Sequence, residues 1–223
     1  MPEEHRDAYR ELRLRVREIV LAAGPDAGDV PSPATPEWTV HDVLAHVVGV
    51  CDDVENGRLE GVASDEWTAK QVDARRATST IEILDEWDTR GPVFEDLLVG
   101  APALMAGQVL FDAFTHESDI RRALGAPGAR ECAAADLGWD FVVSARMRPG
   151  ATPLRFVTDR DDVVVGEGEP VATITTSRFE LLRASTGRRS ADEIAAYGWE
   201  PSPRPELLLL APFFRLRAEP LAE

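Results

Sequence analysis

The sequence predicts an α+β chain, with a four-helix bundle over residues 1–128 and a small α+β domain over residues 133–223. Three observations predict this fold. Apolar residues recur at intervals of three and four through the first 125 residues, as in amphipathic helices. Short runs rich in β-branched residues first appear after residue 150. Between the two regions, residues 126–130 contain Gly and Pro and predict a linker.

The first two helices of the bundle have clear sequence signals. An apolar stripe over residues 9–23 predicts the first helix, and Gly24-Pro25 ends it. A loop rich in Pro, Gly and Asp follows. Thr39 and Asp42 then have the spacing of a capping box, and an apolar stripe directly behind them predicts the second helix.

The other two helices complete the predicted bundle. A third helical region covers residues 68–98, and Gly91-Pro92 predicts a break within it because proline lacks a backbone donor. The fourth helix is predicted over residues 104–124, with Gly125 as its C-terminal signal. Four amphipathic helices joined by loops indicate a bundle.

The second region mixes helix and strand signals. One helix is predicted over residues 134–147, followed by strands at 154–158, 163–165 and 171–175. The Gly-Glu-Gly-Glu stretch at 166–169 has the composition of a hairpin turn.

Two further short helices are expected near the C-terminal end. The pairs Ser177 with Glu180 and Ser190 with Glu193 have capping-box spacing. The apolar tail over residues 205–217 gives no clear secondary-structure signal. These elements together predict a small α+β domain.

Composition excludes several classes of partner. The chain has 24 Lys+Arg against 40 Asp+Glu, a net charge of −16. This excess of acid argues against nucleic acid and anionic membranes, since both require a basic face. No apolar run approaches the roughly 20 residues that span a bilayer. Two cysteines and the lack of a signal-peptide pattern lead us to expect a cytoplasmic protein.

Three residues could form a metal site. His46 lies in the middle of the second helix with valines on its face, so it is expected to point into the bundle. Asp112 and His116 lie one turn apart in the fourth helix. If they meet His46 across the bundle, two imidazoles and a carboxylate form a ligand set typical of catalytic Zn²⁺, with one position open. A satisfied core histidine and a plain Asp–His side-chain pair are the alternatives.

Neighbouring polar residues receive provisional roles. Asp119 either accepts from a ligand histidine or serves as a cap or surface ion pair. Glu117 is expected on the surface, and His41 is expected to face solvent. Cys51 fits a core position better than a ligand position, and Cys132 has no obvious partner in the sequence.

Two segments resemble a known family. Residues 38–47, WTVHDVLAHV, resemble the W-T-V-x-D-x-L-A-H-L helix of the mycothiol-dependent maleylpyruvate isomerase family, which belongs to the DinB-like metal-binding four-helix bundles. Residues 111–127, FDAFTHESDIRRALGAP, resemble its later helix, in which a carboxylate and a His precede D-[IL]-R-x-A-L-G-x-P. Residues 67–76 are similar with lower specificity. The second region resembles the family's C-terminal domain, which is distantly like sterol-carrier proteins.

The resemblance implies a ligand set. In the family, the histidine of the second helix, the carboxylate and the following histidine bind a divalent metal, usually taken to be zinc. Matched by position, these are His46, Asp112 and His116. The family's carboxylate is often Glu, and Asp112 is one methylene shorter. This departure leaves two positions open for Asp112. It either binds the metal directly or contacts a residue that does.

The resemblance also implies an activity. The family's thiol is mycothiol, which a metal ion can hold as thiolate. Two reactions fit such a thiolate: cis–trans isomerisation of a maleylpyruvate-like small molecule, and S-transfer to an electrophile. Both need a cationic group for an anionic substrate or for the developing enolate, and we predict that Arg75 and Arg76 bind the cofactor. The alternative for each is a solvated arginine on the helix surface. Arg121 and Arg122 lie near the second segment.

Two rival interpretations stay open. The chain could be a binding module whose C-terminal domain holds an apolar ligand, with a structural metal or none. It could also be a structural bundle in which Asp112 and His116 form only an internal pair. The sequence leaves open the substrate, the metal and the oligomeric state.

Overall fold

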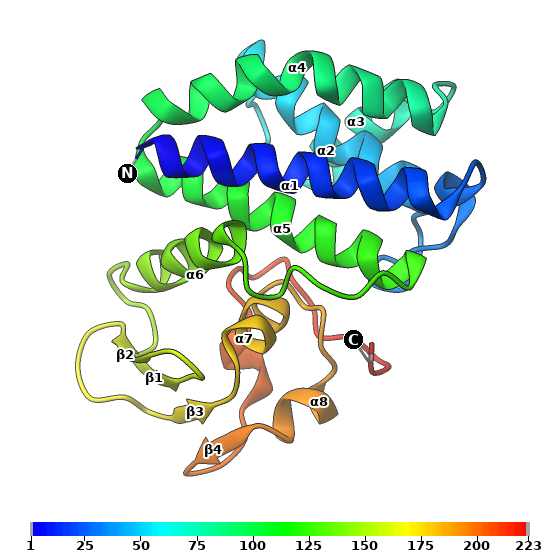
Figure 1. Ribbon diagram of the computed structural model, residues 1–223. Helices are drawn as coiled ribbons and strands as arrows, with labels where there is room; N and C mark the ends of the chain where they lie inside the picture. The colour runs from blue at the N-terminus through cyan, green and yellow to red at the C-terminus, as the bar shows by residue number, and fades with distance from the viewer. Residues whose placement is uncertain (1, 222–223) are drawn as a thin grey trace. The chain divides into compact units, whose positions relative to one another are not determined.

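The computed structural model describes residues 2–221 and divides into two compact units, an N-terminal unit of residues 1–134 and a C-terminal unit of residues 135–223 (Figure 1). The N-terminal unit is helical, and the C-terminal unit contains a small sheet with helices. The chain is therefore α+β, as its sequence predicted.

Four long helices build the N-terminal unit. The helix α1 packs against both α4 and α5, and α2 packs against α4, the short helix α3 and α5. These helices and the 3₁₀ turn η1 have the bounds α1 Pro2–Ala23, η1 Ala27–Asp29, α2 Val40–Glu55, α3 Asp65–Ala74, α4 Thr80–Gly100 and α5 Ala103–Leu124. The predicted capping box of α2 is present, with Thr39 and Asp42 each binding the other's backbone N–H.

Large buried side chains fill the bundle between these helices. Tyr9, Trp87 and Phe94 are almost fully buried, and the ring of Tyr9 contacts the other two, edge-on or tilted. The hydroxyl of Tyr9 accepts from Trp87 Nε1 at 3.1 Å and lies 2.9 Å from Cys51 Sγ. Cys51 is thus a core residue, as predicted.

The third helical region differs from the prediction. It forms two helices, and the break lies at residues 75–79 instead of at Gly91-Pro92. Ser79 and Glu82 form a second capping box that starts α4. Pro92 lies inside α4. Gly91 lies against Arg13, because a Cβ there would be 2.4 Å from Arg13 Nε and would displace that side chain.

Glu117 corrects a second expectation. Its side chain is 1% exposed, although the sequence placed it on the surface. It accepts from Arg15 Nε at 2.9 Å and Nη2 at 2.7 Å, and from Arg121 Nε at 3.0 Å. The prediction failed because it counted only one buried face of α5, whereas α1 packs against a further face.

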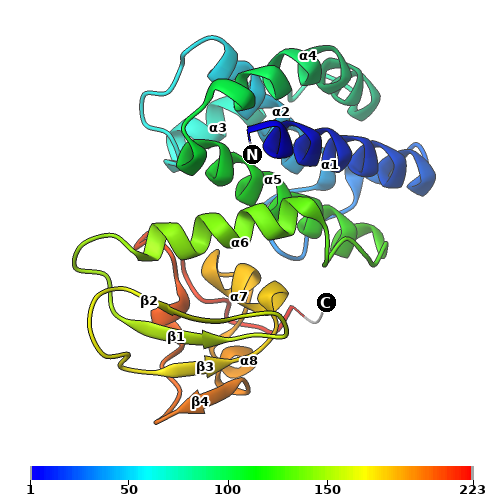
Figure 2. The same ribbon diagram turned by 60° about the vertical axis from the view of Figure 1, so that its left-hand side comes forward.

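The C-terminal unit contains a four-stranded sheet in the order β2-β1-β3-β4 (Figure 2). β1 pairs antiparallel with β2 and parallel with β3, and β3 pairs antiparallel with β4. Trp139 of α6 contacts Phe156 of β1 at 5.9 Å between ring centroids. The elements are α6 Ala133–Arg146, β1 Leu154–Val157, β2 Asp162–Val165, β3 Thr173–Thr175, α7 Arg178–Ser185, α8 Ala191–Ala195, β4 Gly198–Glu200 and η2 Pro205–Leu208.

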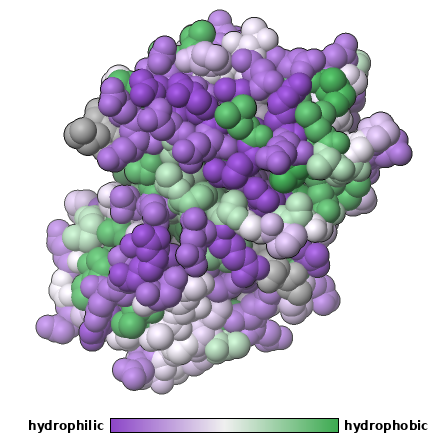
Figure 3. All heavy atoms as spheres, in the orientation of Figure 1, coloured by the Kyte–Doolittle hydropathy of each residue, from purple (hydrophilic) through white to green (hydrophobic). Residues whose placement is uncertain are grey.

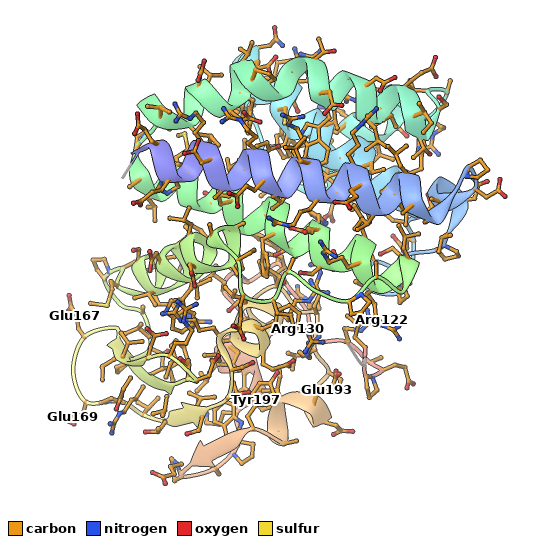
Figure 4. All side chains as sticks on the ribbon, in the orientation of Figure 1. Arg122, Arg130, Glu167, Glu169, Glu193 and Tyr197 are labelled. Carbon is orange, nitrogen blue, oxygen red and sulfur yellow. The ribbon has the colours of Figure 1, made fainter. Side chains whose placement is uncertain are left out.

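The predicted hairpin turn at residues 166–169 is wrong. This segment leads from the edge strand β2 past β1 to β3, so its two flanking strands are not neighbours. Glu167 and Glu169 lie exposed on this loop (Figure 4). The true hairpin joins β1 to β2, where Thr158 N–H donates to Asp161 O at 2.7 Å. The strand β4 was not predicted.

Both short helices of this unit begin at the predicted serines. Ser190 and Glu193 form a complete capping box. Ser177 accepts from Glu180 N–H at 3.2 Å, but the Glu180 carboxylate binds Arg189 and leaves that box incomplete.

Hydrophilic side chains cover most of the face drawn in Figure 3, and hydrophobic ones occur in small separate groups. Among the described residues, no helix combines the length and apolar character needed to cross a bilayer.

Candidate metal centre

The structure brings His46, Asp112 and His116 together inside the N-terminal unit. His46 comes from the middle of α2, and the other two come from α5. One ligand atom from each side chain lies within 4.8 Å of the others. Asp112 Oδ2 is 3.8 Å from His46 Nε2, and Asp112 Oδ1 is 3.7 Å from His116 Nε2. Both imidazoles therefore present Nε2 to one carboxylate.

A carboxylate lies behind His116. Asp119 Oδ2 is 3.2 Å from His116 Nδ1, and the Asp119 side chain is fully buried. This burial excludes the surface ion pair considered for Asp119, and its contact with His116 leaves the interpretation as an acceptor for a candidate ligand histidine. Burial lowers the pKa of His116, while the carboxylates of Asp119 and Asp112 oppose that shift.

A residue that the sequence did not single out lies behind His46. Gln71 of α3 is buried, and its Oε1 is 2.7 Å from His46 Nδ1. Gln71 falls in the 67–76 segment, whose resemblance was the weakest of the three. Its spacing of four from Trp67 places both on one helix face and could have indicated an inward position.

Two tryptophans flank the histidines. The ring of Trp38, just before α2, is 5.5 Å from that of His46 and 6.2 Å from that of His116, stacked on the latter. Trp67 meets His46 edge-on at 6.4 Å. The histidine side chains are each 7% exposed, whereas that of Asp112 is 42% exposed. Asp112 is therefore the solvent-exposed member of the cluster.

The two arginines assigned to thiol binding have other partners. Arg75 is buried and donates to both carboxylate oxygens of Glu86, at 2.9 Å and 2.6 Å. Arg76 is exposed and pairs with Asp73. Their role in thiol binding stays a prediction, which these contacts do not support.

His41 also differs from its expectation. It is 18% exposed and its Nε2 lies 2.8 Å from the carbonyl oxygen of Thr78. This contact ties α2 to the connection between α3 and α4.

The N-terminal unit is a helical bundle in which two helices bring two imidazoles and a carboxylate together. It therefore belongs to the class of helical bundles that have a candidate metal site in the core. The family model described as the mycothiol maleylpyruvate isomerase N-terminal domain matches residues 9–121, which is just over half of the chain. The chain therefore belongs to the mycothiol maleylpyruvate isomerase family.

One solved structure agrees in fold. It is the crystal structure of a histidine-to-alanine mutant of the mycothiol-dependent maleylpyruvate isomerase, with a TM-score of 0.57 and 12% sequence identity. The match covers 92% of this chain and 96% of that one. At this identity the likeness is one of fold. No curated protein matches the chain.

Proposed function

We propose that this chain is a divalent-metal enzyme that uses mycothiol to act on a small electrophilic molecule. The observation that carries the proposal is the convergence of His46, Asp112 and His116 within 4.8 Å. Two imidazole nitrogens and one carboxylate oxygen fit zinc, which commonly takes such a set in catalytic sites and leaves a position open. When bound there, zinc supplies a positive charge that keeps a thiol in its thiolate form at neutral pH.

The chain's own residues prepare the site. His46 and His116 turn Nε2 toward Asp112, whose carboxylate would neutralise part of the charge of a bound metal ion. Trp38 and Trp67 exclude water from the histidine side. The exposed edge of Asp112 leaves room for thiol and substrate. No nucleophilic cysteine of the chain is required, because the thiol comes with the co-substrate.

The family's description favours cis–trans isomerisation over S-transfer. In this reaction the thiol sulfur adds to one carbon of an activated C=C bond, and the remaining single bond rotates. The same sulfur then leaves and the double bond re-forms, so no atom is gained or lost.

The first test is metal content by elemental mass spectrometry on protein purified without a metal-binding tag. Wild type is expected to hold about one zinc per chain, and His46→Ala and His116→Ala to lose it. If Asp112→Ala keeps its zinc, the Asp112 carboxylate does not bind the metal directly and instead contacts the residues that do. His41→Ala, on the same helix but outside the cluster, is the matched control and should keep the metal. Absence of metal from reconstituted wild type would refute the proposal.

The second test separates the two reactions. Loaded protein is mixed with mycothiol and maleylpyruvate, and the products are identified by mass spectrometry and by chromatography against the two isomers. A product of unchanged mass with catalytic mycothiol indicates isomerisation, whereas stoichiometric consumption of mycothiol into an adduct indicates S-transfer. No reaction by either route, with metal bound, would contradict an enzymatic role on these compounds.

A pocket in the C-terminal unit supports a second candidate, a binding module. It is an open groove with a volume of about 550 Å³, and its lining includes four apolar side chains with two arginines and one glutamate: Leu209, Leu210, Phe214, Leu216, Arg148, Arg215 and Glu206. Apolar walls next to cations suit an apolar carboxylic acid. Calorimetry with a long-chain fatty acid tests this, and saturable binding that Leu210→Glu abolishes would favour it.

A further inference from the structure

We propose that Gln71, oriented by Asp53, is a positioning residue that holds the proton of His46 on Nδ1 and so turns the Nε2 lone pair toward Asp112 and His116. This inference rests on the proposed metal site and adds a device that selects one tautomer of a ligand histidine.

A continuous chain of hydrogen bonds leads away from His46. Gln71 Oε1 lies 2.7 Å from His46 Nδ1, and Gln71 Nε2 donates to Asp53 Oδ2 at 2.7 Å. Asp53 Oδ1 accepts in turn from Arg58 Nε at 2.8 Å. The carbonyl oxygen of Arg58 accepts from Trp67 Nε1 at 3.0 Å, which ties the loop after α2 to α3.

The directions of these hydrogen bonds follow from the groups involved. An ionised carboxylate only accepts, so the amide group of Gln71 must present its NH₂ to Asp53. Its oxygen then faces His46, and that oxygen can only accept a proton. His46 must therefore carry hydrogen on Nδ1, which leaves Nε2 as the acceptor nitrogen that a metal ion needs. A carboxylate two groups away thus decides which nitrogen of His46 is free.

His116 also has an acceptor group next to its Nδ1, but without a relaying amide. The carboxylate of Asp119 lies directly behind its Nδ1, at 3.2 Å. The two histidines therefore differ in the group that contacts Nδ1. A buried carboxylate contacts His116, whereas a neutral amide that is itself hydrogen-bonded to a carboxylate contacts His46.

The packing of α2 against α3 makes room for this amide. A Cβ at Gly49, three residues after His46, would lie 2.5 Å from Gln71 Cβ and 2.7 Å from its Cγ. Gly49 is the position at which the side chain of Gln71 crosses α2 on its way to His46. A larger residue there would push Gln71 away without removing any polar group.

The test reads the tautomer directly in metal-free protein. Long-range ¹H–¹⁵N correlation spectra at about pH 8.5, where an ordinary imidazole is neutral, distinguish Nδ1–H from Nε2–H. Wild type is expected to show His46 as Nδ1–H. Gln71→Met keeps the length but removes the acceptor, so His46 is expected to shift toward the Nε2–H form that free imidazole prefers. Lys70→Met on the exposed side of α3 is the matched control.

Zinc affinity gives an independent readout by competition with a chromogenic chelator. Gln71→Met is expected to weaken zinc binding about 10–100-fold, as loss of groups behind metal ligands does. The double variant Asp53→Asn/Gln71→Glu exchanges carboxylate and amide while keeping both hydrogen bonds, and it should restore the Nδ1–H signal and most of the affinity.

The outcomes separate the inference from the proposed function. A wild-type chain that binds no zinc refutes the metal enzyme, while the tautomer measurement still stands. A wild-type chain that binds zinc, with Gln71→Met unchanged in both tautomer and affinity, overturns the role of Gln71. Failure of the double variant to recover the Nδ1–H signal, when it folds as wild type does, would also contradict it.

Discussion

At the scale of single residues, the two cysteines lie in different surroundings and should react differently. Cys51 is fully buried, and burial raises the pKa of its thiol to about 12. Cys132 is half-buried, with its sulfur 3.6 Å from Arg15 Nη2. The thiolate is the reactive form, so Cys51 should be inert at neutral pH.

A thiol-reactive disulfide such as dithiobis(nitrobenzoic acid) should therefore titrate one thiol in native protein and the second only in denaturant. Cys132→Ser identifies the fast thiol, because it should abolish the native reaction. Rapid reaction of two thiols in folded protein would contradict the buried position of Cys51.

The ion pair of Arg75 with Glu86 should make the free energy of unfolding depend on pH in the acidic range. Burial alone raises the pKa of Glu86, but hydrogen bonds from Arg75 and Arg90 outweigh it, so the pKa lies below its ordinary 4.5. A carboxyl with a lowered pKa contributes stability above pH 4.5 that is lost as pH falls through the folded-state value.

We expect Glu86→Gln to cost about 1.5–3 kcal/mol of unfolding free energy at neutral pH, the range for hydrogen bonds to charged groups. The difference from wild type should shrink below about pH 4.5, where wild type also loses the charge. Urea unfolding at several pH values measures this, with Glu18→Gln on the exposed side of α1 as control. A constant difference across that pH range would show that the charge of Glu86 is not responsible.

At the scale of elements, the boundary between α3 and α4 depends on a cap that apolar periodicity does not reveal. Ser79 accepts from Glu82 N–H, and the Glu82 carboxylate accepts from Ser79 N–H at 2.9 Å. This S-x-x-E spacing is visible in the sequence, but the Gly-Pro pair further on gave the stronger signal for a break. In the structure α4 continues through both Gly91 and Pro92.

Ser79→Ala should destabilise the chain by about 1 kcal/mol, the usual effect of losing an N-cap side chain. Thermal unfolding followed by circular dichroism measures it. Thr89→Ala, exposed and in the middle of α4, removes a hydroxyl without removing a cap and should have little effect. Equal losses in the two variants would argue against a specific role of the cap.

At the scale of the whole molecule, metal binding should stabilise one unit selectively. The three candidate ligands all belong to the N-terminal unit, and so do Gln71 and Asp119, which contact the two histidines. A ligand that binds only folded protein adds about 2.7 kcal/mol at about 100 times its dissociation constant.

Hydrogen-exchange mass spectrometry should therefore show slower exchange in peptides from α2 and α5 when zinc is added, reversed by a chelator. Peptides from residues 135–221 act as an internal control and should not change. Uniform protection of both units, or none in α2 and α5 while zinc remains bound, would contradict a site confined to the bundle.

The sequence by itself determined the features that depend on local chemistry. Helical periodicity, the Thr39 and Ser190 capping boxes and β-branched runs are encoded within a few residues, so the α+β fold could be predicted. The spacing of Asp112 and His116 placed two candidate ligands on one face of a helix, and the apolar face of the second helix directed His46 toward them. The family segments supported the same three residues.

Only the tertiary structure decided what depends on contacts between distant segments. Glu117 is buried because α1 lies against it, and Gln71 reaches His46 from 25 residues away. The parallel pairing of β1 with β3 depends on a crossover whose turn residues resemble those of a hairpin. Local propensity carries no information on which elements meet, since burial and pairing arise from packing of the whole unit. For that reason the candidate ligands could be predicted, but the residues that contact them from behind were not all within reach of the sequence.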